Sequence, residues 1–101
     1  MKIDDVVKVV SKRYDVSEEE IVGEPKEGRV GDVQQIALFL VREGTVQSLL
    51  EIAKAFSRTH VAVIHGVKTI SQKMETDAVF KAEVESTREE LRAKCGSLRI
   101  V

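Results

Sequence analysis

Residues 48–73, SLLEIAKAFSRTHVAVIHGVKTISQK, contain the pattern around which the chain is organised. Ser48 and Glu51 have the S-x-x-E spacing of a capping box, in which the serine hydroxyl caps an amide and the glutamate bonds back. Apolar residues then recur at intervals of three and four along one helix face, at Leu49, Ile52, Ala53 and Phe56. The sequence therefore predicts a short helix that begins after Ser48.

A longer helix is expected after a three-residue break, Ser57-Arg58-Thr59. Thr59 suits the N-cap position, because its hydroxyl can accept a hydrogen bond from an amide of the first turn. At about 100° per residue, one side of this helix is apolar and is predicted to face the core; it carries Val63, Ile64, Val67, Ile70 and Met74. The other side carries Val61, Ala62, His65, Lys68, Thr69, Gln72 and Lys73.

This pair of helices is basic in a chain that is not. Residues 52–73 contain four Lys or Arg and no acidic residue, whereas the whole chain has a net charge of −1. Two helices joined by a short turn, the second of them basic, describe a helix-turn-helix at about residues 48–74 whose second helix can enter a DNA major groove. An ordinary helical hairpin with a solvated polar face fits the same pattern, and on geometry alone it is the more common arrangement.

The chain before this pair is also predicted to be helical. Apolar residues at helical spacing indicate a first helix over residues 3–14: Ile3, Val6, Val7, Val10 and Tyr14. Ser17 and Glu20 form a second S-x-x-E cap, which predicts a short helix through Val22. After a Gly/Pro-rich break, Asp32 can cap a central helix that runs to Glu43.

Gly44 is expected to end the central helix as a C′ glycine. A last helix follows the basic pair, with one stripe formed by Phe80, Val84, Thr87, Leu91 and Cys95. Its other residues are mainly acidic, so its outer face should point away from DNA. Packing within the chain is the expected use of the stripe, and dimer formation or binding of a protein partner is the alternative.

Length and composition predict a single domain over residues 1–101. At 101 residues the chain can bury roughly two-thirds of its surface, which suffices for a core without disulfides or metals. Its 43% hydrophobic and 33% charged content suits a soluble globular protein. One proline, one tyrosine and no tryptophan favour helices over a sheet. The expected fold is all-α, a compact bundle of five to six helices that contains the helix-turn-helix.

Three blocks of the sequence resemble the C-terminal DNA-binding domain of the bacterial replication initiator DnaA. They are QQIALFLVRE at residues 34–43, SLLEIAKAF at 48–56 and RTHVAVIHG at 58–66. The family shows RQIAMYL.RE, SL.EIG..F and GGRDHTTVLHA in the same order and spacing, and the resemblance extends over about residues 3–91. It implies an all-helical fold related to Trp repressor and binding to short duplex boxes at replication origins, in replication initiation or its regulation.

The base-reading residues depart from the family pattern. The Gly-Gly-Arg-Asp of the family is one residue shorter here, so Thr59 takes the place of the aspartate. Both histidines of the family are kept, as His60 and His65, but its two base-reading threonines are Val61 and Ala62. The resemblance therefore implies the scaffold, and it does not carry over the specificity for origin boxes.

The flanking contacts also differ. The basic loop of the family, which enters the minor groove, corresponds to GEPKEGRVGD at residues 23–32, where only Lys26 and Arg29 are basic. The Arg-Gln pair of the family is Gln34-Gln35 here. The set that the resemblance and the charge pattern imply for DNA binding is Lys26, Arg29, Gln35, Lys54, Arg58, Thr59, His60, Val61, Ala62, His65 and Lys68.

These residues have different expected roles. His60, in the first turn, and His65, about one turn further, can reach base edges, and the cations can contact phosphates. Lys73 is a further candidate for a phosphate contact. Val61 and Ala62 offer only methyl contact to thymine. Because an exposed Val61 is unusual on a purely solvated face, it mildly favours a contact surface. The alternative is a helical module on the same scaffold that has lost DNA binding and binds protein.

The sequence contains no motif for catalysis or for a cofactor. No G-x-x-x-x-G-K-[ST] occurs, which predicts no nucleotide, and His60 and His65 lack the i, i+4 spacing of helical metal ligands. We expect no enzyme activity and no metal. Cys95 is single and is interpreted as an incidental thiol, and the apolar tail at residues 98–101 has no assigned role. Neither a signal peptide nor a membrane-length apolar run is present, so a cytoplasmic location is expected.

Overall fold

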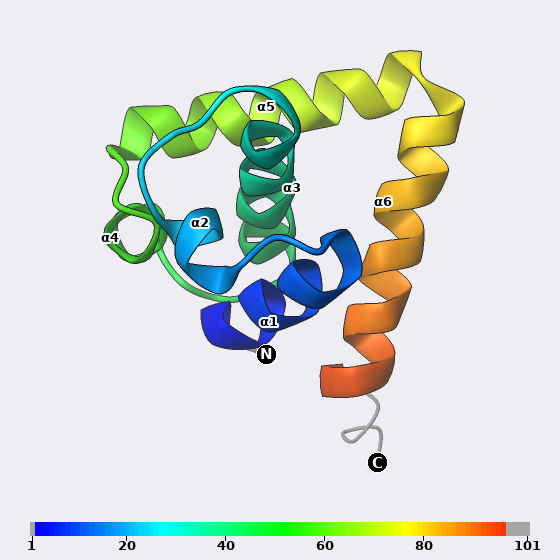
Figure 1. Cartoon of the computed structure of the whole chain (residues 1–101), viewed down its shortest axis with the longest axis horizontal. Coiled ribbons are helices and arrows are strands. Elements are labelled where there is room, and N and C mark those ends of the chain that lie inside the picture. The colour runs from blue at the N-terminus through cyan, green and yellow to red at the C-terminus, as the bar shows by residue number, and fades with distance from the viewer. Residues whose placement is uncertain (1, 97–101) are drawn as a thin grey trace.

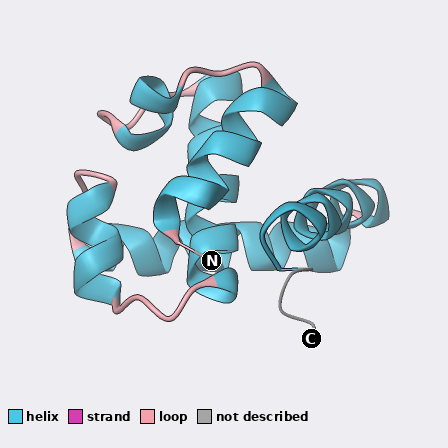
Figure 2. Ribbon diagram, turned by 90° about the horizontal axis from the view of Figure 1, so that it is seen from below, coloured by secondary structure: helices cyan, strands magenta, loops and turns pink. Residues whose placement is uncertain are grey.

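The computed structural model describes residues 2–96, and they form helices joined by short connections (Figures 1 and 2). The helices are α1 (Ile3–Tyr14), α2 (Glu18–Val22), α3 (Gly28–Gly44), α4 (Leu49–Ala55), α5 (His60–Thr76) and α6 (Ala78–Leu91), with a π-helical turn at Arg92–Gly96. No strand occurs in this range. The all-α prediction is confirmed. The side chain of Cys95 and the apolar tail lie outside the described residues.

The central helix α3 organises the core. It packs against α1, α2, α4 and α5, and Figure 1 shows it running between α5 at one end and α1 at the other. Its burial extends around most of the helix: Val33, Gln34, Ile36, Ala37, Leu38, Phe39, Leu40 and Val41 are all buried. Such all-round burial is typical of a helix enclosed by its neighbours.

The predicted start of α3 is wrong, and so is the predicted C′ role of Gly44, although the helix ends within one residue of the expected Glu43. The helix begins at Gly28, four residues before Asp32, because Gly28 takes a φ of +70° that favours glycine and turns the chain into the helix. Gly44 is the last helical residue and not a C′ glycine. The cap is Thr45, whose amide and hydroxyl donate to the Val41 carbonyl at 3.0 and 2.8 Å, so no left-handed residue is required.

The helix-turn-helix forms as its caps predict. Ser48 and Glu51 make both bonds of the capping box, at 2.9 and 3.1 Å, and the Thr59 hydroxyl accepts from the amide of Ala62 at 3.1 Å. Between the helices Ser57 has a φ of +55°, and the amide of Arg58 donates to the Ala53 carbonyl at 2.8 Å. The fully buried ring of Phe56 anchors this turn in the core.

The core side of α5 differs from the prediction at one residue. Val63, Gly66 and Ile70 are buried, and Val67 and Met74 are partly buried, but Ile64 is 47% exposed. The reason lies at Gly66, where a Cβ atom would lie 3.2 Å from Leu38 Cδ1. Since α5 approaches α3 closely at this glycine, the buried stripe passes through residue 66, and Ile64 turns outward.

The stripe of α6 packs within the chain, as expected. Val84, Thr87 and Leu91 are buried, and the Tyr14 and Thr87 hydroxyls lie 3.0 Å apart, which ties α1 to α6. The Arg13 guanidinium donates to Glu83 at 3.1 Å, Glu90 at 2.9 Å and the Ser86 hydroxyl at 3.0 Å. One arginine thus joins α1 to three residues of α6.

We expect Arg13→Ala to lower the free energy of unfolding by about 1–2 kcal/mol, because three hydrogen bonds to a partly buried arginine are lost. The hydrogen bond that Arg13 donates to Glu90 lowers the pKa of the Glu90 carboxyl in the folded state. The stability that comes from Glu90 is therefore fully present above its ordinary pKa of 4.5 and is lost as the pH falls through the lower folded-state value. Urea unfolding of the parent and of Arg13→Ala at pH 7 and in acid measures the difference in their free energies of unfolding. That difference should shrink in acid. An equal difference at both pH values would contradict this assignment.

Candidate nucleic-acid interface

The outward side of α5 carries a mixed apolar and basic stripe. Val61 is 64% exposed and Ile64 is 47% exposed, and His65 and Lys68 are exposed beside them. These four residues are called the recognition face. His60, also exposed, opens the helix at its N-terminal end. Apolar side chains of this size on a solvent face indicate a contact surface.

One groove lies along α5 beside the loop that joins α2 to α3. It has a volume of about 200 Å³ and is called the loop groove. Five residues of the predicted DNA-binding set line it: Lys26, Gln35, Arg58, Ala62 and His65. The structure therefore brings together residues from the loop, α3, the turn and α5. Ala62, which was expected on the exposed side of α5, is half-buried in this groove. Ile64, which was expected to face the core, is exposed instead.

Arg58 has a structural task in this groove. Its Nη1 atom donates to the Phe56 carbonyl at 2.6 Å and to the Gly23 carbonyl, so it links the turn to the end of α2. Burial lowers the pKa of the Arg58 guanidinium, but an arginine remains charged at neutral pH. Its positive charge is therefore held in place under the loop.

A second groove, of about 580 Å³, lies on the other side of the recognition face. Arg42 of α3, Leu49 of α4 and Ile64 and Lys68 of α5 are among its lining residues, and it is called the α3–α4 groove. Arg42 was not among the residues predicted from the sequence. The signal was present: Arg42 is a basic residue in the last turn of the helix that precedes the helix-turn-helix.

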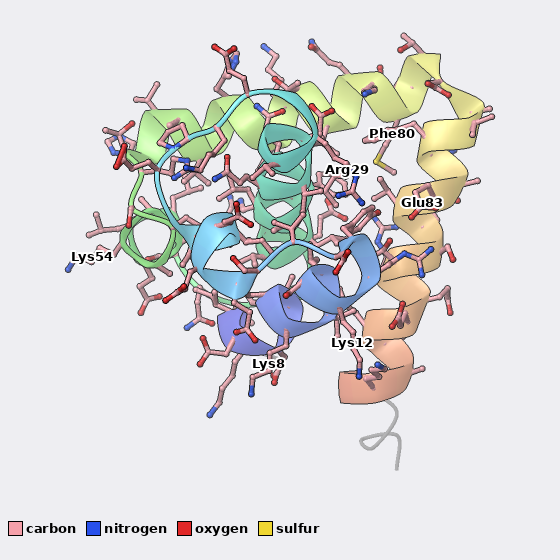
Figure 3. All side chains as sticks on the ribbon, viewed as in Figure 1. Lys8, Lys12, Arg29, Lys54, Phe80 and Glu83 are labelled. Carbon is pink, nitrogen blue, oxygen red and sulfur yellow. The ribbon has the colours of Figure 1, made fainter. Side chains whose placement is uncertain are left out.

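Other predicted cations point elsewhere. The Arg29 guanidinium donates to the Tyr14 carbonyl, and Figure 3 places it on the α6 side of α3. Lys54 projects from α4 at the opposite edge of the molecule (Figure 3). The Lys73 ammonium lies 4.6 Å from the centre of the Phe80 ring. The basic residues thus do not form one continuous face, and those that line the two grooves along α5 are Lys26, Arg42, Arg58 and Lys68.

Two further observations concern residues 2–96 as a whole. No helix in this range has both the length and the apolar character needed to cross a membrane. Among the side chains that the structure describes, His, Asp and Glu form no group of three or more that could hold a metal ion.

Thr59 contributes to the interface through its cap. We expect Thr59→Ala to lower the free energy of unfolding by about 1 kcal/mol, because the amide of Ala62 loses its acceptor. The first turn of α5, which carries His60, should then fray. Urea unfolding and hydrogen exchange at residues 60–62 test this, with Thr76→Ala at the other end of α5 as a control. Unchanged exchange in that turn would contradict it.

The fold and the exposed second helix define the class of the protein as a helix-turn-helix protein. The family model described as "Bacterial dnaA protein helix-turn-helix" matches residues 3–70. The chain belongs to this family.

Curated relatives agree with that assignment. The chain is 33% identical over 93 residues to the "Chromosomal replication initiator protein DnaA" of Rhodopseudomonas palustris (strain BisA53), covering 91% of this chain and 20% of that protein. The proteins of the same name from Bradyrhizobium sp. (strain ORS 278) and Nautilia profundicola are 32% and 29% identical, over 91% of this chain and 20% and 21% of theirs. The chain thus spans about a fifth of the length of these relatives.

Proposed function

We propose that this chain binds duplex DNA by placing the recognition face of α5 in the major groove. One observation carries the proposal: the recognition face is exposed between two grooves, and each groove has a cation at its side. Helix-turn-helix proteins dock in this way, with the second helix between the two phosphate backbones. The names of the relatives support a role in replication initiation or its regulation.

The residues divide into two roles. Lys26 on one side and Arg42 and Lys68 on the other would contact phosphates, which position the protein and strengthen binding without reading sequence. His60 and His65 would donate to or accept from base edges. Val61 and Ile64 would pack against thymine methyl groups, the only apolar feature of the major-groove edges.

Gln35 and Arg58 would contact DNA from the floor of the loop groove. Thr59 would contribute by capping the first turn of α5. Arg29 and Lys54 stay in the proposed set only as peripheral phosphate contacts, since they diverge from α5 (Figure 3). With about four to six such contacts, affinity should be micromolar for a single domain and should fall steeply with salt.

A separate observation favours a second candidate function, the binding of a protein partner. The dispersal of Arg29 and Lys54 away from α5 favours a helical module that binds protein through the same face. Val46 and Leu50, both highly exposed and apolar, would extend such a surface around α4. A protein-binding face would bind without the salt dependence of phosphate contacts.

Paired lysine variants separate the two functions. Lys26→Ala/Lys68→Ala removes one cation from each side of α5, and Lys8→Ala/Lys12→Ala removes two from α1, on the edge of the molecule away from α5 (Figure 3). In fluorescence anisotropy with a randomised duplex, the first pair should weaken binding about 10- to 30-fold and reduce the log–log salt slope by almost two, since each phosphate contributes about 0.9. The control pair should stay within about twofold. Equal effects of both pairs would overturn the proposal.

A further inference from the structure

Gln34 is a buried polar residue that no predicted contact uses. It lies in α3 with 2% of its surface exposed, at the position where the family pattern has arginine. A buried amide is costly unless its donors and acceptor are all bonded. Its bonding partners therefore show what the residue does.

All of these partners belong to α2 and the loop after it. Nε2 donates to the Glu20 carbonyl at 2.7 Å and to the Glu24 carbonyl at 2.9 Å. Oε1 accepts from the backbone amide of Lys26 at 2.9 Å. Only this orientation of the amide places donors against carbonyls and the acceptor against an N–H group. One side chain thus fixes three backbone positions of an irregular segment.

Two more contacts restrict the same loop. A Cβ atom on Gly31 would lie 2.1 Å from the Lys26 carbonyl oxygen, so the loop lies directly on the first turn of α3. The Arg58 guanidinium holds the Gly23 carbonyl at the other end. Lys26 is consequently held at the edge of the loop groove, on the side opposite the α3–α4 groove.

We propose that Gln34 is a positioning residue for DNA binding, which fixes the loop at residues 24–27 so that Lys26 lies at the groove that His65 also lines before DNA arrives. The inference rests on the proposed function of the recognition face. A preorganised loop binds more tightly because less conformational freedom is lost on association. The buried glutamine thus orders a loop in which Lys26 is the only basic residue.

Gln34→Met tests this role, since methionine has a similar length and lacks the amide. Thr87→Val is the matched control: it also removes buried hydrogen bonds, one between α1 and α6 and one within α6. After correction for the folded fraction by urea unfolding, we expect Gln34→Met to weaken binding to a randomised duplex about fivefold. Thr87→Val should remain within about twofold. Equal weakening by both variants would overturn the proposal.

A double-mutant cycle shows whether Gln34 acts through Lys26. Lys26→Ala alone should weaken binding about three- to fivefold, because one phosphate contact is lost. In the Gln34→Met background the same change should cost less than about 1.5-fold, since Lys26 is no longer held in place. Additive effects would overturn the coupling.

Gly31→Ala serves as a second variant if Gln34→Met does not fold. It displaces the loop from α3 and leaves the glutamine intact, and it should reproduce the weaker binding and the loss of the Lys26 effect. Full parental affinity in this variant would contradict the proposal. If the parent itself binds no duplex at low salt, the proposed function fails. If the parent binds and the cycle is additive, only the role of Gln34 fails.

Discussion

Ile64→Glu is expected to abolish most DNA binding while the protein stays folded. The side chain is 47% exposed at the centre of the recognition face, so the free energy of unfolding should change by no more than about 1 kcal/mol. In a complex the new carboxylate would face phosphates on both sides. We expect a loss of about 2–3 kcal/mol of binding energy, roughly 30- to 150-fold in Kd, measured by anisotropy at low salt.

Val79→Glu is the matched control for this charge. Val79 is 81% exposed in the first turn of α6, outside the proposed interface, and a glutamate near a helix N-terminus is mildly favourable. Its Kd should change by less than about threefold, which reflects only the added net charge. If both variants bind DNA equally well, the recognition face is not the DNA-binding surface.

Phe56→Ala is expected to cause the largest loss of stability, about 3–5 kcal/mol. The ring is fully buried at the turn between α4 and α5, and its removal leaves a cavity beneath the helix-turn-helix. A domain of this size has only about 5–15 kcal/mol of stability in total, so a large fraction would be lost. Urea unfolding followed by circular dichroism measures the change.

Leu50→Ala provides the comparison within α4. Because Leu50 is exposed, this substitution should lower the free energy of unfolding by less than about 0.5 kcal/mol. DNA binding by Phe56→Ala should weaken with the fraction of folded protein. A Phe56→Ala variant as stable as the parent would show that the turn does not depend on its buried ring.

The local parts of the structure could be predicted from the sequence. The caps at Ser48 and Thr59 form between residues three apart, so their spacing alone identifies them. The start of α3 could not be predicted in this way. It depends on the left-handed conformation of Gly28, and Asp32, four residues later, offered a conventional cap signal.

The candidate site was predicted less completely. Ile64 and Val63 are adjacent apolar residues, and helical periodicity alone cannot decide which of them faces the core. The close approach at Gly66 decides it, and that is a tertiary contact. Arg58 was predicted as a phosphate contact from its charge, but its hydrogen bonds to two backbone carbonyls exist only in the folded chain. The three bonds of Gln34 join residues 8 to 14 positions apart and leave no pattern in the sequence.

The proposed function requires that α5 presents its recognition face to duplex DNA. The most direct test is nuclear magnetic resonance of the 15N-labelled chain during titration with a duplex at low salt. The largest amide shift changes should fall in residues 60–72 and in the loop at 24–27, and they should reverse as salt is added. Changes concentrated on α6 or α1, or none with excess duplex and a folded protein, would contradict the claim.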